Sequence, residues 1–249
     1  MEEVMKIAKI EVQYDSHKGT DLSIVNTARQ SFAKRKEVMD KSDEGLIKYL
    51  ALGFSSSAWD NLMIELANSN DPLVIDKIVR EIKKTPVHWA PFASAVVTLK
   101  VKVPIWMSRQ LMKHQIGLTW SEESRRYIDS EPEFWFPENY RARGENVKQG
   151  SSQTEFVDEG PDIGRDATYD ALQTYNMLLD MNVAPEHARI HLPQNMMVNF
   201  DWTGSLVAWA RIYNQRSGHG AQTDHDDFVH GVDLNIRDLY PHSWKALTA

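Results

Sequence analysis

The segment from residue 96 to residue 127 restricts the fold of this chain most, because a strand pattern passes directly into a helix pattern. Residues 96–103 alternate between apolar and polar side chains, as a strand with one buried face does. Pro104 then opens a helical pattern in which Ile105 and Leu111 can face the core. We therefore expect a strand that leads into a packed helix, and the polar residues that follow form a candidate site.

These polar residues concentrate charge. Arg109 and Lys113 lie four residues apart, so on one helix the two cations repel each other unless an anion lies between them. A phosphate group is such an anion. Residues 121–126 add hydroxyls, carboxylates and guanidinium groups that suit a sugar phosphate and a heterocycle. The charge spacing alone favours a solvated helix end followed by a polar loop, so an explanation without a ligand stays open.

Three motifs follow one another here, namely VPIWMSRQ at 103–110, Lys113-His114-Gln115, and SEESRRY at 121–127. Their order resembles the signature of the flavin-dependent thymidylate synthases. That family has Arg-Gln, two residues, Arg-His-Arg, and then seven residues to the Ser of an Asn-Glu-x-Ser-x-Arg-Tyr box. In this chain the triplet is Lys-His-Gln, the spacing to Ser124 is one residue longer, and Ser121 replaces the usual Asn.

Two further blocks keep the order of the same family. Residues 19–32 resemble its N-terminal block, in which the Ser at the position of Ser31 lies near the cofactor. Residues 184–222 contain a Pro-x-x-x-Ala-Arg-x-x-Leu-Pro element, whose Arg is Arg189, and a C-terminal block whose Arg is Arg216. Separate matches in one order are more specific than any one of them.

The resemblance implies a role for each matching residue. The dUMP-binding residues would be Arg109, Gln110, Glu122, Glu123, Ser124, Arg125, Arg126, Arg189 and Arg216. Of these, Arg216, Ser124 and Arg126 would be catalytic, and Arg216 would stabilise a partly anionic uracil ring. The FAD-binding residues would be Ser31, Lys113, His114, Gln115, Glu122, Arg211 and His219.

The same resemblance implies a fold and a reaction. The fold would be α+β, with a twisted, largely antiparallel sheet flanked by helices. The reaction would convert dUMP to dTMP, with methylenetetrahydrofolate as carbon donor and NADPH reducing FAD. The assembly would be a homotetramer with active sites between subunits. Two alternatives remain, a flavin- and folate-dependent dUMP hydroxymethylase and a non-catalytic nucleotide-binding relative.

Composition excludes several other classes. The chain has 0 Cys, which removes disulfides, thiolate metal sites and the Cys nucleophile of the classical thymidylate synthases. A net charge of −7 argues against a broad nucleic-acid surface. No long apolar window exists and the N-terminus is acidic, so we expect no membrane segment and a cytoplasmic protein. His187 and His191 lie four apart, but no metal motif accompanies them, so no metal is expected.

The chain pattern predicts one domain over 1–249, with a helical insertion about 55–84 and a flexible excursion about 141–164. The expected elements are a strand over 5–14, a polar turn over 15–20, helices over 22–32, 44–52, 58–68, 72–84, 166–181, 205–215 and 224–239, and a strand over 196–200. Asp21 is expected to cap the first helix, and Pro241 with the tail is expected to stop the last one.

Overall fold

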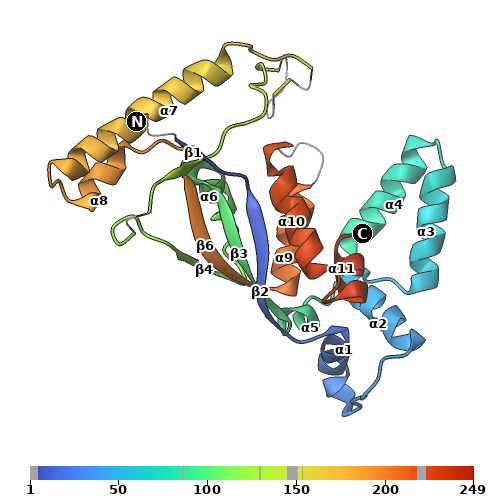
Figure 1. Ribbon diagram of the computed structural model, residues 1–249. Helices are drawn as coiled ribbons and strands as arrows, with labels where there is room; N and C mark the ends of the chain where they lie inside the picture. The colour runs from blue at the N-terminus through green and yellow to red at the C-terminus, as the bar shows by residue number, and fades with distance from the viewer. Residues whose placement is uncertain (1–4, 86, 129, 145–150, 153, 218–222) are drawn as a thin grey trace.

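The computed structural model describes residues 5–85, 87–128, 130–144, 151–152, 154–217 and 223–249. Its centre is a four-stranded antiparallel sheet in the order β2-β3-β6-β4 (Figure 1). The strands are β2 (Glu11–Lys18), β3 (Val96–Pro104), β4 (Leu118–Glu122) and β6 (Met197–Ser205). This sheet with its surrounding helices confirms the predicted α+β class.

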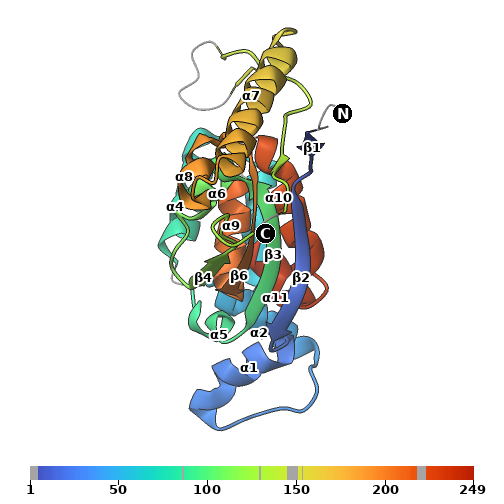
Figure 2. The same ribbon diagram turned by 60° about the vertical axis from the view of Figure 1, so that its left-hand side comes forward.

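One face of the sheet forms the main core. The alternation predicted for β3 places Val97 and Leu99 on this face, and both are fully buried. Helices α9 (Leu206–Arg216) and α10 (Asp226–Ile236) lie on the same side of the sheet (Figures 1 and 2). Trp209 of α9 donates its indole N–H to the carbonyl of Val97 at 3.1 Å. The sheet and α9 are therefore joined by packing and by a buried hydrogen bond.

The opposite face of the sheet is polar. Thr98 of β3 and Thr203 of β6 are paired, and their hydroxyls lie 2.9 Å apart. Lys100 lies opposite Asp201 in the same register. Side chains alternate between the two faces along each strand, so the residues that lie between the core-facing ones share this polar surface. It is the surface on which part of the candidate site lies.

Helices α1 (Asp21–Arg29), α2 (Lys41–Leu52) and α11 (Pro241–Leu247) pack together at one end of the sheet. A 3₁₀ turn over Gln30–Phe32 follows α1. The predicted capping role of Asp21 is wrong, because Thr20 caps α1 and accepts from the N–H of Ser23. Asp21 is 5% exposed and accepts from the N–H groups of His242 and Ser243 at 2.8 and 3.0 Å. It therefore stabilises the start of α11, in the tail that was expected to stop the chain's last helix.

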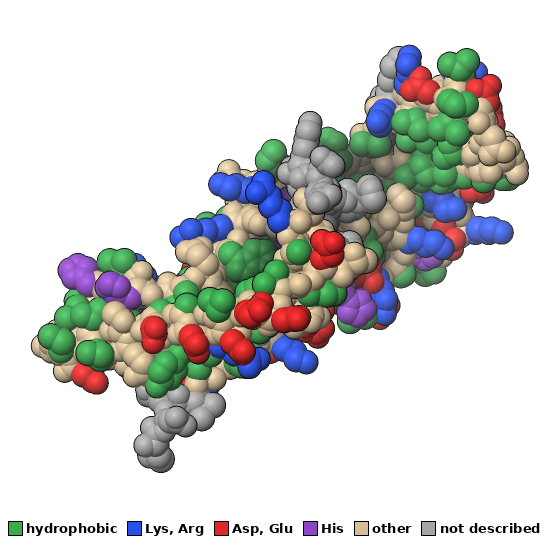
Figure 3. Space-filling view, turned by 90° about the horizontal axis from the view of Figure 1, so that it is seen from above, with side chains coloured by type: hydrophobic (Ala, Val, Ile, Leu, Met, Phe, Trp, Pro, Cys, Tyr) green, Lys and Arg blue, Asp and Glu red, His purple; other side chains and the backbone are tan. Residues whose placement is uncertain are grey.

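Residues of the predicted helical insertion form a hairpin of α3 (Ser56–Asn68) and α4 (Pro72–Lys84). Ser55 and Asp71 cap the two helices, and Pro72 occupies the first turn of α4. The hairpin stands apart from the sheet, and hydrophobic side chains gather on that lobe (Figure 3). A short helix α5 (Ala90–Ala93) then leads into β3.

The other end of the molecule has a second core around the long helix α7 (Gly160–Asp180). The elements here are β1 (Lys6–Ile7), which pairs in parallel with β5 (Glu133–Phe134), the helix α8 (Pro185–Ala188), and a 3₁₀ turn over Arg189–His191. The helix α6 (Ile105–Leu111) joins the two cores, because Ile105 packs on this one and Met107 and Leu111 are buried in the main core. A line of acidic side chains follows this lobe, and α7 carries the exposed Asp162, Asp166 and Asp170 (Figure 3).

Several element boundaries differ from the predictions. The polar turn predicted for 15–20 is wrong in its first part, because β2 continues past an irregularity at Tyr14 and Ser16 and pairs with β3 as far as Lys18. Helix α7 begins at Gly160, earlier than predicted and inside the predicted excursion, where Arg141 and Phe156 also form a β-bridge. Strand β6 extends beyond its predicted end because β3 pairs with it throughout.

A 3₁₀ turn over Thr223–His225 precedes α10. Among the described helices, none combines the length and the apolar character that a membrane crossing requires.

Candidate functional site

The structure brings three of the predicted site residues together where α6 and α9 end. Arg216 at the end of α9 donates through Nε to His114 Nε2 at 3.2 Å. Its Nη2 donates to the backbone carbonyl of Gln110 at 2.9 Å, and its Nη1 lies 3.5 Å from Gln110 Oε1. The guanidinium is half-buried, and burial lowers the pKa of Arg216 below its ordinary value. The cation is therefore held in one orientation by two neighbours.

The protonation of His114 matters for this arrangement. Burial lowers the pKa of His114, and the positive charges of Arg216 and Arg211 lower it further. The ring is therefore neutral at pH 7, and its Nε2 can accept the hydrogen bond from Arg216. A protonated ring would instead place a second cation against the guanidinium.

A cavity of about 150 Å³ lies next to this cluster and gathers four of the predicted FAD-binding residues. Lys113, His114, Gln115 and Arg211 line it, together with the apolar Ile116, Leu118 and Ala208 and with Gln215. Two cations and an apolar wall within one cavity suit an anionic cofactor with a flat ring. Helix α6 ends at Leu111, so Lys113 lies in the turn after it and does not share a helix face with Arg109 as the spacing had suggested.

The turn between the Lys-His-Gln triplet and β4 depends on a glycine. Gly117 has a φ of +78°, a conformation that side chains disfavour. A Cβ at Gly117 would lie 3.0 Å from Ser205 Oγ and 3.3 Å from Ala208 Cβ, so the turn packs closely on the start of α9. Strand β4 begins directly after this turn, at Leu118.

A second group of predicted residues lies at the other end of β4. Glu122 accepts from the indole N–H of Trp120 at 3.2 Å, and burial raises the pKa of Glu122 while that hydrogen bond opposes the rise. The next residue, Glu123, accepts from the side-chain amide of Asn199 at 2.9 Å. Neither Trp120 nor Asn199 belongs to the motifs, although the alternation along β4 places Trp120 on the same face as Glu122.

The loop after β4 brings Ser124 and Arg189 together. Arg189 Nη1 lies 3.4 Å from Ser124 Oγ within one chain. The guanidinium of Arg126 lies 5.0 Å from the ring centroid of Tyr127, which is 76% exposed. These groups form an exposed cationic and hydroxyl surface.

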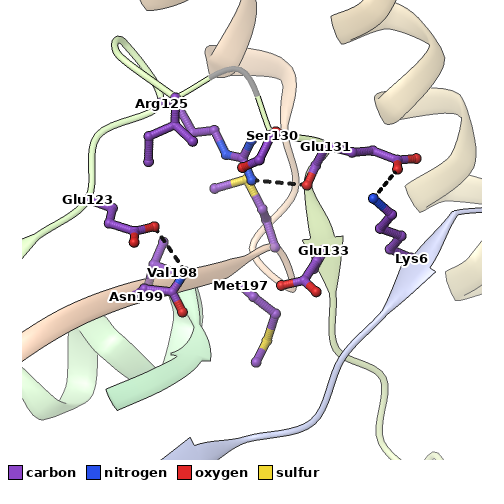
Figure 4. Close-up of a pocket in the computed structure, with 11 residues that line it drawn as sticks. Lys6, Glu123, Arg125, Ser130, Glu131, Glu133, Met197, Val198 and Asn199 are labelled. Carbon is purple, nitrogen blue, oxygen red and sulfur yellow. Dashed lines mark hydrogen bonds and ion pairs between the residues drawn. The ribbon is translucent and has the colours of Figure 1, made fainter. Parts of the chain in front are cut away.

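Arg125 has a different environment, which Figure 4 shows. Its guanidinium donates to the backbone carbonyls of Ser130 and Glu131, the second at 3.4 Å. Glu131 in turn pairs with Lys6 at 2.7 Å. These residues line a cavity of about 240 Å³. Arg125 therefore braces the loop that carries Ser124, and its predicted contact with phosphate would need these bonds to break.

The other predicted residues stand apart from both groups. Arg109 is exposed on the last turn of α6. Ser31 is exposed in the 3₁₀ turn after α1. His219 lies outside the described residues. Among the residues that are described, no three His, Cys, Asp or Glu side chains gather in an arrangement that could hold a metal ion.

Comparison with known proteins gives a family match over most of the chain. The family model described as thymidylate synthase complementing protein matches residues 12–242. The flavin-dependent thymidylate synthase of Thermosipho africanus is 31% identical over 165 residues, which is 64% of this chain and 71% of that protein. The enzyme of the same name from Thermus thermophilus is 28% identical over 176 residues, which is 71% of this chain and 63% of that protein.

The solved structures include a similar fold. The UMP/dUMP methylase PolB from Streptomyces cacaoi, bound with 5-Br dUMP, superposes with a TM-score of 0.72 over 98% of this chain and 97% of that chain. The two sequences are 22% identical, so this likeness establishes the fold alone.

Proposed function

The chain belongs to the flavin-dependent thymidylate synthase family, matched over residues 12–242, and on that premise we propose how its residues convert dUMP to dTMP. The observation that carries the proposal is the half-buried guanidinium of Arg216, held by Gln110 and His114. Methylation at C5 needs higher electron density at that carbon, and this chain has 0 Cys to supply it by covalent attack. The protein must therefore raise it electrostatically.

Arg216 is the group that does this. Its guanidinium faces N3 and O2 of the uracil ring and stabilises the negative charge that develops there as C5 attacks the one-carbon unit. His114 Nε2 and the Gln110 carbonyl accept from Nε and Nη2 of Arg216, so the remaining N–H groups of the guanidinium are available to the base. Because the cation is oriented before the base arrives, no reorganisation is needed during the reaction.

The nucleotide is held at its other end by the residues at and after the end of β4. Arg126 and Arg189 bind the phosphate, Ser124 donates its hydroxyl to a phosphate oxygen, and Glu122 accepts from a sugar hydroxyl. Ser124 acts as a positioning donor and not as a nucleophile. Arg125 supports this loop through the carbonyls of Ser130 and Glu131.

The residues around the smaller cavity fit FAD. Lys113 and Arg211 would pair with the diphosphate, Gln115 would bond the ring edge, and Ile116 and Leu118 would cover the ring. When bound, FAD reduced by NADPH supplies the hydride that completes the methyl group derived from methylenetetrahydrofolate. The protein residues hold this cofactor and exclude water from it.

The size of that cavity supports a site shared between subunits. Ligand pockets usually measure roughly 300–1,000 Å³, whereas this cavity measures about 150 Å³ in one chain. A neighbouring chain would supply the missing wall, as in the homotetramer that the family resemblance implies. A cytoplasmic location remains part of the same proposal.

Two experiments test the proposal. First, the purified protein is examined for flavin absorption and then incubated with dUMP, methylenetetrahydrofolate and NADPH. A nucleotide product with the mass of dTMP supports the reaction, and a hydroxymethylated product or unchanged dUMP contradicts it. Second, Arg216→Ala and Arg126→Ala are mixed after partial unfolding and refolding. Recovered activity supports sites built from two chains, and two inactive variants that stay inactive together contradict them.

A further inference from the structure

We propose that Trp120, which none of the family motifs contains, is a positioning residue that holds the Glu122 carboxylate toward the sugar of the bound nucleotide. The proposal rests on the proposed function, because it assumes that dUMP binds beside Glu122. Its structural basis is the hydrogen bond from Trp120 Nε1 to Glu122 Oε2 at 3.2 Å.

The indole ring is fixed before it makes this bond. Trp120 stacks on Phe200 with ring centroids 3.4 Å apart and an interplanar angle of 18°. It also meets Trp202 edge-on at 5.2 Å, and the two residues are opposite each other in the β4–β6 register. Rotation of the indole would break both ring contacts, so the N–H direction is set by the sheet.

Glu122 benefits from that fixed donor because it is the last residue of an edge strand. It lies two residues after Trp120, so both side chains leave β4 on the same face. The bond occupies one carboxylate oxygen and leaves Oε1 free to accept from a hydroxyl group. A carboxylate has acceptors only, which suits the hydroxyl donors of a sugar and disfavours a phosphate.

The groups around Glu122 differ between the two faces of the sheet. Glu122 lies at the edge of a cavity of about 640 Å³, but its side chain leaves β4 on the face of Trp120, where Trp202 and Phe200 also lie. The charged groups that line the same cavity are Glu11 of β2, Lys100 and Lys102 of β3, Glu123 beside it, and Asp201 of β6. By the same alternation, Lys100 and Asp201 leave the sheet on the other face, so the indole N–H of Trp120 is the group that orients the Glu122 carboxylate on its own face.

The test compares Trp120→Phe, Glu122→Ala and the double variant by calorimetric titration with dUMP and by steady-state kinetics. Trp120→Phe keeps an aromatic ring on Phe200 and removes only the N–H. We expect it to weaken dUMP binding about 3- to 10-fold, through KM more than through kcat, which is the range for losing one hydrogen bond. In the Glu122→Ala background the same substitution should have almost no further effect.

A pH series separates positioning from packing. The pKa of Glu122 is raised by burial and lowered by the indole bond, so Trp120→Phe raises it further. The loss of dUMP affinity on acidification should therefore begin at a higher pH in Trp120→Phe than in the wild type. Trp59→Phe, on helix α3 of the hairpin, is the matched control and should leave binding unchanged.

Three results would overturn the inference. The first is a wild-type affinity for dUMP in Trp120→Phe. The second is an equal loss of dUMP affinity on Trp120→Phe whether residue 122 is Glu or Ala. The third is a pH dependence of dUMP binding in Trp120→Phe that is the same as in the wild type. A wild-type protein that binds no dUMP would instead refute the proposed function, because that result does not depend on Trp120.

Discussion

Replacing Arg216 by Lys tests the assignment of the base-activating cation most directly. The substitution keeps a positive charge at the end of α9 but removes the planar fork. In the wild type, Nε donates to His114 Nε2 at 3.2 Å and Nη2 donates to the carbonyl of Gln110 at 2.9 Å. The third contact, from Nη1 to Gln110 Oε1 at 3.5 Å, is at the limit for a hydrogen bond and adds little to the free energy that orients the guanidinium.

The two shorter contacts set the size of the effect. A hydrogen bond to a charged group contributes about 1.5–3 kcal/mol. A lysine ammonium can restore one of the two, so the net loss of orientation is about 1.5–3 kcal/mol, or roughly 10- to 150-fold in kcat. Arg216→Ala also removes the charge facing the ring, and loss of such a donor costs about 10²–10³ in kcat by itself.

Single-turnover formation of dTMP, followed by chromatography of quenched reactions, measures this step. Circular dichroism and a dUMP titration check that each variant folds and binds. Arg237→Lys is the matched control, because Arg237 is exposed directly after the end of α10 and forms an ion pair with Asp233 at 3.2 Å. Turnover by Arg216→Lys within about threefold of the wild type would refute the reasoning, since such a change is smaller than the loss of one hydrogen bond to a charged group.

Three other predictions address the cofactor, the fold and the pH dependence. The double variant Lys113→Arg with Gln115→Arg should raise FAD affinity by about 1 kcal/mol or more, because a guanidinium group binds phosphate through two parallel hydrogen bonds. Titration of FAD at two salt concentrations measures this change. Weaker or unchanged binding would mean that other contacts hold the flavin. Asp21→Ala should lower the free energy of unfolding by about 1–2 kcal/mol in urea, since it removes two hydrogen bonds at the start of α11, and an unchanged midpoint would exclude that capping role. Because the pKa of His114 lies below its ordinary value, its ring is neutral at neutral pH and accepts the hydrogen bond from Arg216. In a pH series, kcat should therefore fall only once the pH drops below this lowered pKa. His114→Gln should remove this fall of kcat at acidic pH, and an unchanged fall in the variant would contradict the prediction.

The parts of the fold that follow local patterns were predictable. The alternation of residues 96–103 gave β3, whose apolar residues are buried as expected. The capping residues and Pro72 marked α4, whose predicted bounds of 72–84 agree with the structure. In both elements the structure depends on residues close together in the sequence, so the strand and the helix can be predicted from the local pattern alone.

The parts that depend on distant residues were not predictable. Asp21 precedes a helix and therefore has the sequence context of a cap, but its carboxylate binds a helix that begins at Pro241. Strand β2 extends through residues with turn-like composition because β3 offers a partner along its whole length. Tertiary pairing overrides local preference in both examples.

The candidate site also has features that the sequence predicts and features that only the structure shows. The motifs identify Arg216, Gln110 and His114 separately, and the structure adds that they contact one another. Trp120 carries no motif signal, since its role depends on a stack with Phe200 that lies far away in the sequence. Only the alternation along β4 points to it.

The geometry of β4 links the two halves of the site. Leu118 at its start lines the cavity of Lys113 and His114, and Glu122 at its end accepts from Trp120. Four steps along an antiparallel strand span about 13 Å, so β4 itself separates the cations that we propose to bind flavin from the carboxylate that we propose to bind the sugar. The sheet fixes this separation, because β4 pairs with β6 along its whole length. On that reasoning, substitutions at the two ends of β4 should act on different parts of the bound ligands, the start on flavin affinity and the end on nucleotide affinity.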